Sequence, residues 1–156
     1  MKTIEDYKNF LAEVRKETGI AALTSDETGL VSVNVNEKYI VNLQFVEATG
    51  RILCFVEVAA LPKDASTDVY RDLLAGGLFG KETGGGHFAL EPETETVVYN
   101  YFFDLEKAAE DVEDFIHTLE KILQLCDIWA ERIKSGPARA GEEPPGDDRE
   151  HNRIFA

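Results

Sequence analysis

The residues of this sequence that could do chemistry are few, and the most suggestive of them lie in a glycine-rich stretch. Residues 80–86 read Gly-Lys-Glu-Thr-Gly-Gly-Gly, and a Gly-Lys pair is part of the loop that cradles phosphates in nucleotide-binding proteins. That loop also requires an earlier glycine, a serine or threonine after the lysine, and a helix behind it. This sequence has Ala75 and Glu82 at those two positions. The spacing argues against phosphate binding and favours a flexible connection, so we expect no nucleotide and no other cofactor.

Histidine and carboxylate side chains give little support for a metal site. The sequence has three histidines, and His117 follows Asp114 at the spacing that places two ligands on one face of a helix. A carboxylate-bridged metal centre needs such pairs from several helices, and this chain offers one. We therefore expect no metal, and we assign these side chains to a solvated helix flank.

The two cysteines show no pattern of a reactive or metal-binding thiol. Cys54 and Cys126 lie in apolar contexts, with no C-x-x-C motif and no zinc-finger spacing. Neither has a histidine nearby in sequence, and no G-x-S-x-G motif is present. We expect buried, reduced thiols in a cytoplasmic protein, and we expect no enzyme.

The charge of the chain limits its partners. Sixteen Lys and Arg stand against thirty Asp and Glu in 156 residues, which gives a net charge of −14. Such a surface repels nucleic-acid phosphates and anionic lipid, so we expect neither nucleic acid nor a membrane as partner. The N-terminus lacks the apolar stretch of a secretory signal, and no apolar run is long enough to span a membrane. A cytoplasmic location follows as an expectation.

The elements that must position these residues follow from the apolar spacing. Helical spacing in the first segment predicts a helix over residues 3–17, with Thr3 as its cap and Gly19 at its end. After it the apolar period changes to two. That period predicts an antiparallel meander of three strands over residues 31–35, 39–46 and 52–59.

A second set of elements follows the meander. A short helix over residues 66–75 ends at two glycines, and two strands over residues 87–91 and 96–103 come next. A long amphipathic helix is predicted from Asp104, or from nearer Ala108, to about Lys134. The order α-β-β-β-α-β-β-α predicts an α+β domain over residues 1–134, with one mainly antiparallel, twisted sheet packed by helices. Residues 135–156 are rich in proline, glycine and charge, which predicts a flexible tail that is dispensable for folding.

The third predicted strand is apolar on both sides. Alternate residues from Ile52 to Val58 form one apolar face, and Leu53 and Phe55 lie on the other. Two apolar faces are typical of a central strand, or of a surface that a partner covers. Both interpretations remain open from the sequence.

The second predicted helix and the strand after it resemble a known family. Residues 73–79 (LLAGGLF) and 83–92 (TGGGHFALEP) resemble the core of type III secretion chaperones of the Tir-chaperone (CesT-like) class. The final helix, with Phe115, Leu119, Leu123 and Trp129, is similar to theirs, and the family has the same order of elements. One departure is Gly77, where the family often carries asparagine; the proline- and glycine-rich tail is another.

The resemblance implies a function and two surfaces. It implies a bacterial homodimer that, without ATP, binds the N-terminal segment of a secreted effector in extended form and keeps the effector competent for secretion. The dimer contact would lie around the second helix, at Leu73, Leu74, Leu78, Phe79, Phe88 and Leu90. The effector segment would meet apolar residues near the first helix and along the sheet: Ile4, Tyr7, Leu11, Leu30, Leu43, Phe45, Leu53 and Phe55. For each residue of both sets, a place in the monomer core is the alternative.

Two other functions remain open from the sequence. The first is a protein-binding or regulatory module that reuses the same fold outside secretion. The second is an enzyme with a site that no motif reveals. A neighbouring gene for a secreted effector would favour the chaperone, and a polar pocket with perturbed titratable groups would favour the enzyme.

Overall fold

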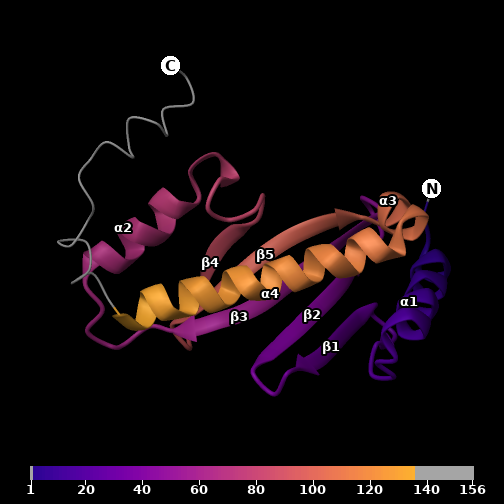
Figure 1. Cartoon of the computed structure of the whole chain (residues 1–156), viewed down its shortest axis with the longest axis horizontal. Helices are drawn as coiled ribbons and strands as arrows, with labels where there is room; N and C mark the ends of the chain where they lie inside the picture. Colours follow the sequence, from indigo (N-terminus) through magenta and orange to yellow (C-terminus); the bar gives the residue numbers. More distant parts are fainter. Residues whose placement is uncertain (1, 136–156) are drawn as a thin grey trace.

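The structure is a computed structural model that describes residues 2–135 (Figure 1). The predicted tail therefore lies outside the described residues, apart from Ser135, the last residue of the final helix. Five strands form one sheet in the order β1-β2-β3-β5-β4, and every neighbouring pair is antiparallel. The α+β fold with one antiparallel sheet is thus confirmed.

The N-terminal helix α1 (Ile4–Thr18) begins and ends as its sequence predicts. The Thr3 hydroxyl accepts a hydrogen bond from the Asp6 N–H, and the Asp6 carboxylate accepts one from the Thr3 N–H at 2.8 Å. This reciprocal pair is a capping box. At the other end Gly19 adopts the left-handed conformation, with φ of 72°, which glycine reaches without strain.

Strand β3 is the central strand of the sheet, as one interpretation of its two apolar faces predicts. It pairs with β2 on one side and with β5 on the other. The tight turn between β1 and β2 is fixed to the last helix, because Lys38 and the Tyr39 hydroxyl both contact the Asp127 carboxylate, at 2.6 and 2.7 Å. The strands are β1 (Leu30–Val35), β2 (Tyr39–Val46), β3 (Arg51–Ala60), β4 (His87–Glu91) and β5 (Thr96–Asp104).

One face of the sheet carries the core, and helices pack on it. Tyr7 of α1 stacks on Phe45 at 5.1 Å between ring centroids, and its hydroxyl donates to the Leu43 carbonyl. Phe115 of the long helix contacts the Phe103 ring of β5 at 4.6 Å. The alternate residues of β3 from Ile52 to Val58 are buried on this face.

The final helical region is two helices, which corrects the prediction of one continuous helix from Asp104. Helix α3 (Leu105–Glu110) and helix α4 (Val112–Ser135) are separated at Asp111, whose φ and ψ of −139° and 82° are not helical. The Asp111 carboxylate accepts a hydrogen bond from the Asp114 N–H at 3.0 Å. The side chain therefore caps the new helix, which is the reason that the first one stops there.

The remaining helix, α2 (Thr67–Gly76), stands beside the C-terminal end of α4, at the opposite end of the molecule from α1 (Figure 1). A short 3-10 helix, η1 (Leu78–Gly80), follows it and leads through the glycine-rich turn into β4. The helix ends at two glycines, as the sequence predicts. These segments surround a hollow lined by apolar side chains.

Candidate partner-binding surfaces

Apolar side chains, most of them from α2, η1 and β4, surround an open hollow of about 570 Å³. We call these side chains the α2–β4 surface. Leu73 and Phe88 are half-buried within it, whereas Leu74, Leu78 and Phe79 are 81, 62 and 59% exposed. Isolated exposed leucines are common, but a contiguous group around a hollow is typical of an interaction site. The surface comprises Leu61, Tyr70, Leu73, Leu74, Leu78, Phe79, Phe88, Leu90 and Val97.

The structure brings together all six residues that the sequence analysis assigns to a dimer contact. Leu73 and Leu74 come from α2, Leu78 and Phe79 from η1, and Phe88 and Leu90 from β4, and all six line the hollow. Tyr70 and Leu61 line it too, and sequence reasoning did not assign them. The signal for Tyr70 was present, because it lies one helical turn before Leu73 and Leu74.

Phe79 has an unusual backbone conformation. Its φ of 58° lies in the left-handed region, which glycine adopts freely and which costs most other residues free energy. The aromatic side chain is nevertheless exposed beside the hollow.

The glycine-rich turn packs against α4 and β5. The Trp129 indole N–H donates to the Glu82 carbonyl at 3.2 Å, and the Tyr99 hydroxyl donates to the Thr83 carbonyl at 2.6 Å. A Cβ atom at Gly76 would collide with the Trp129 ring. The glycines at this end therefore allow close packing, and no helix follows the turn as a phosphate loop would require.

The second candidate surface is the sheet face opposite the core. We call it the open sheet face and define it by Ile40, Leu53, Phe55, Val98 and Phe102. Leu53 lies opposite Phe102, and Phe55 opposite Asn100, so their side chains share one face. Ile40 and Phe102 are 46 and 38% exposed, and the other three are half-buried. The Arg51 guanidinium lies 4.1 Å from the Phe102 ring centroid.

The structure divides the eight residues that the sequence analysis assigns to effector binding. Four are buried in the core and present no surface in this conformation: Tyr7, Leu11, Leu43 and Phe45. Leu30, Leu53 and Phe55 are half-buried on the open side of the sheet, and Ile4 is half-buried at the start of α1. Ile40 and Phe102 were not assigned, although the period-two spacing of β2 and β5 places their side chains on the same sheet face as Leu53 and Phe55.

Both cysteine thiols lie in the core, away from solvent. Cys54 of β3 and Cys126 of α4 are both buried and free. Burial disfavours the thiolate and raises the pKa of each to about 12. The reactive form of a cysteine is the thiolate, so neither thiol is a nucleophile at neutral pH.

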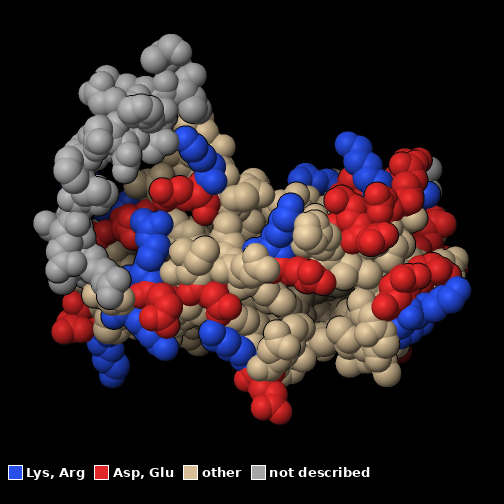
Figure 2. All heavy atoms as spheres, in the orientation of Figure 1, with Lys and Arg blue, Asp and Glu red and all other residues tan. Residues whose placement is uncertain are grey.

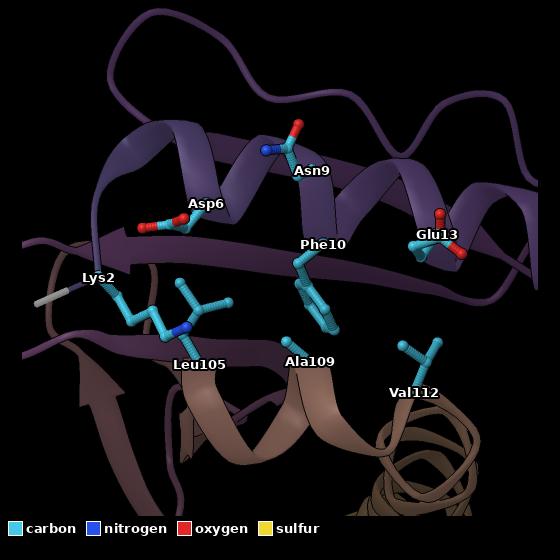
Figure 3. Close-up of a pocket in the computed structure, with 8 residues that line it drawn as sticks. All are labelled: Lys2, Asp6, Asn9, Phe10, Glu13, Leu105, Ala109 and Val112. Atoms are coloured by element: carbon cyan, nitrogen blue, oxygen red, sulfur yellow. The ribbon is translucent and has the colours of Figure 1, made fainter.

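A smaller cleft of about 290 Å³ lies between α1 and α3 (Figure 3). Phe10 points into it from α1, and Leu105 and Ala109 face it from α3. Among its polar groups, the Asp6 carboxylate is engaged with Thr3, and these hydrogen bonds lower its pKa. The cleft is therefore a seam between two helices, with apolar side chains on both of its walls.

Acidic side chains and one histidine surround an open hollow of about 550 Å³ at the start of α4, lined by Asp111, Glu113, Asp114, Ile116, His117 and Glu120. On the face shown in Figure 2, acidic side chains gather over the end formed by α1 and α3. Across residues 2–135, no group of three His, Cys, Asp or Glu side chains is arranged to hold a metal ion. None of the helices in that part of the chain is long and apolar enough to cross a membrane.

Comparisons with known proteins agree with the fold. The chain is 26% identical over 117 residues to the Chlamydia pneumoniae protein CPj0713/CpB0740, covering 74% of this chain and 86% of that protein. A chain of the ExsC–ExsE complex superposes with a TM-score of 0.72 at 21% identity, covering 85% of this chain and 97% of that one.

Two further solved structures share the fold. A chain of the HopA1–SchA chaperone–effector complex has a TM-score of 0.70 at 19% identity, covering 83% of this chain and 96% of that one. The structure of the Yersinia pestis type III secretion chaperone SycH in complex with a stable fragment of YscM2 gives a TM-score of 0.57 at 18% identity. The match covers 76% of this chain and 98% of that one. Residues 9–130 match the family described as Tir chaperone protein (CesT). The chain therefore belongs to the Tir chaperone (CesT) family and has the fold of type III secretion chaperones.

Proposed function

We propose that this protein is a dimeric chaperone that binds the N-terminal segment of a type III secreted effector and keeps it secretion-competent without ATP. Family membership supports a binding role rather than catalysis. The solved neighbours include a chaperone–effector complex and a secretion chaperone bound to a protein fragment. The observation that carries the proposal is that, among residues 2–135, a chain of this family exposes two separate apolar surfaces.

The α2–β4 surface is assigned to the second copy of the chain. A two-fold interface places the same patch of both subunits in contact, so the patch must be self-complementary. This surface has both a hollow and protruding side chains, because Leu74 and Leu78 project beside a cavity lined by Phe88 and Leu90. Projections of one copy can therefore enter the hollow of the other.

The open sheet face is assigned to the effector segment. An extended peptide that lies on an apolar sheet face buries every second side chain against that face. Leu53 and Phe55 of β3 and Phe102 of β5 supply apolar positions on this face. Arg51 and Glu57 of β3 lie at the polar margin of this face. Four of the eight residues that the resemblance implies for the effector lie in the core, which favours this face for the client. A location in the cytoplasm accompanies this function.

One experiment tests both assignments. The chain is co-expressed with N-terminal segments of candidate secreted effectors from its own host, and each complex is isolated after nucleotides are removed enzymatically. We expect Leu78→Asp to yield a monomer by sedimentation, because a charge in an apolar interface is unpaired. Phe55→Asp is expected to leave the dimer intact but to weaken effector binding, by about 1–3 kcal/mol for a lost apolar anchor.

The controls lie on the same elements. Asn34→Asp places a charge at an exposed polar position on the open side of the sheet, and Thr67→Asp does so on α2. Both controls should behave as wild type. A monomeric wild-type protein would refute the dimer, and an effector complex that survives Phe55→Asp unchanged would refute the client surface.

A further inference from the structure

Helix α2 is attached to the rest of the chain by few contacts of its own. Of its ten residues, only Val69 and Gly76 are buried, and Ser66 at its N-cap forms no side-chain hydrogen bond to the helix. Helix α1, by comparison, buries four residues and has a complete capping box. The position of α2, and with it that of Leu74, therefore depends on side chains outside the helix.

Arg132 of α4 contacts both segments that lead into the α2–β4 surface. One guanidinium nitrogen lies 2.6 Å from the Asp72 carboxylate on α2, and the other lies 3.4 Å from the Glu82 carboxylate in the glycine-rich turn. Asp72 and Glu82 are ten residues apart in sequence and flank Leu78 and Phe79. A single side chain thus joins the two ends of the exposed apolar segment to α4.

The guanidinium is itself held in place by stacking. It lies 3.9 Å from the Trp129 ring centroid, and the planar group of an arginine keeps its hydrogen-bonding edge free when it stacks on an aromatic face. Trp129 also contacts the Phe88 ring, with 4.7 Å between the ring centroids, and it packs against Gly76. Arg132 and Trp129 together connect α2, the glycine-rich turn and β4.

We propose that Arg132 is the positioning residue of the α2–β4 surface: through Asp72 and Glu82 it holds α2 and the glycine-rich turn in the arrangement that presents Leu74, Leu78 and Phe79 to a partner. This inference rests on the proposed function, because the surface that Arg132 positions is the one assigned to the second copy. When the two ion pairs open, α2 keeps the burial of Val69 and Gly76 and loses its ionic attachment to α4.

The ion pairs are partly exposed, so their closure is adjustable. The Arg132, Asp72 and Glu82 side chains are 37, 46 and 56% exposed, and such pairs are screened by salt. Each exposed pair changes an equilibrium constant by up to about fivefold. Opening of α2 is therefore expected to increase with ionic strength while the sheet and α1 stay closed.

Hydrogen–deuterium exchange of the full chain tests the proposal directly. In Arg132→Gln we expect residues 67–86 to exchange about threefold to tenfold faster than in wild type, because exchange follows the local opening equilibrium. Strands β1 to β3 should exchange at the wild-type rate. The matched control is Lys38→Gln, which removes another 2.6 Å ion pair to α4, at the β1–β2 turn. This control should leave residues 67–86 unchanged.

The second measurement is the dimer dissociation constant by sedimentation. Arg132→Gln is expected to raise it by about the same factor, and Arg132→Lys by less, since lysine keeps the charge and loses the stacked, two-sided geometry. Wild-type exchange rates in residues 67–86 of Arg132→Gln, or equal loosening by Lys38→Gln, would overturn the proposal. A monomeric wild-type chain would remove the proposed dimer, whereas the exchange comparison would still decide whether Arg132 positions α2.

Discussion

Helices α1 and α2 are both amphipathic, and they differ in how much of the apolar side the rest of residues 2–135 covers. Helix α1 buries Tyr7, Phe10, Leu11 and Val14 against the sheet and α4. Helix α2 leaves Leu74 almost fully exposed and Tyr70 partly so. The same periodicity in sequence therefore serves the monomer core at one end of the molecule and an uncovered surface at the other.

The apolar spacing of a helix therefore does not identify which neighbour or partner covers it. Tyr7 and Leu11 have the spacing expected of a docking stripe, yet both are buried, and Tyr7 packs on Leu43 and Phe45 of β2. The amount of apolar surface that a neighbouring element can cover decides the outcome. Helix α2 has the sheet edge and one end of α4 as neighbours, and these cover only part of it.

The largest expected effect separates the two helices by stability. Leu11→Ala should lower the free energy of unfolding by about 2–5 kcal/mol, because it leaves a cavity among buried side chains. Leu74→Ala should change it by less than about 0.5 kcal/mol, because that side chain is exposed in the monomer. Urea unfolding at two protein concentrations measures both, and a loss that vanishes on dilution belongs to the dimer. Equal losses for both variants at both concentrations would contradict the comparison.

A smaller effect is expected where α2 approaches α4. Gly76→Ala places a Cβ atom against the Trp129 ring, and such overpacking costs about 1–3 kcal/mol. Gly77→Ala is the matched control, since the nearest atom to its Cβ is 3.5 Å away and its φ of −78° is ordinary. Trp129 is the one tryptophan of the chain, so its fluorescence reports the shift. The idea fails if the two alanine variants have the same emission and stability.

The smallest effect compares the two helix starts. Thr3→Ala removes a capping box and should cost about 1 kcal/mol, whereas Ser66→Ala removes no side-chain cap. The hydrogen bonds from Thr3 lower the pKa of Asp6 below its usual 3.8, so their contribution is present at neutral pH. It is lost as the pH falls below that value, because a protonated carboxyl accepts these bonds poorly. Thermal unfolding at neutral and acid pH measures both, and a larger loss for Ser66→Ala would reverse the ranking.

The elements were predictable from the sequence because their signals are local. Thr3, Gly19 and the alternation in β3 each depend on residues within one segment, and the structure has them as predicted. The break at Asp111 was missed, although an aspartate three residues before Asp114 is a cap signal. A continuous apolar stripe on both sides of the break concealed it.

The surfaces were predictable only in part, because coverage is decided between segments. Period-two spacing assigns Leu43 and Leu53 to strands, and it does not say which of the two faces the helices will cover. The register across β2 and β3 decides this, and it depends on contacts that are distant in sequence. The six residues expected at a dimer contact lie around one hollow; the family resemblance placed them together, and no local pattern does so.

The left-handed backbone of Phe79 has a consequence for how sequence variation acts on this protein. A non-glycine residue in that conformation costs the folded monomer about 1 kcal/mol or more, and glycine at the same position would relieve it. Selection for monomer stability alone would therefore favour glycine here, and selection for an exposed aromatic ring would favour phenylalanine. A glycine variant at this one position would stabilise the isolated chain and would remove an exposed ring from the surface that we propose for a second copy.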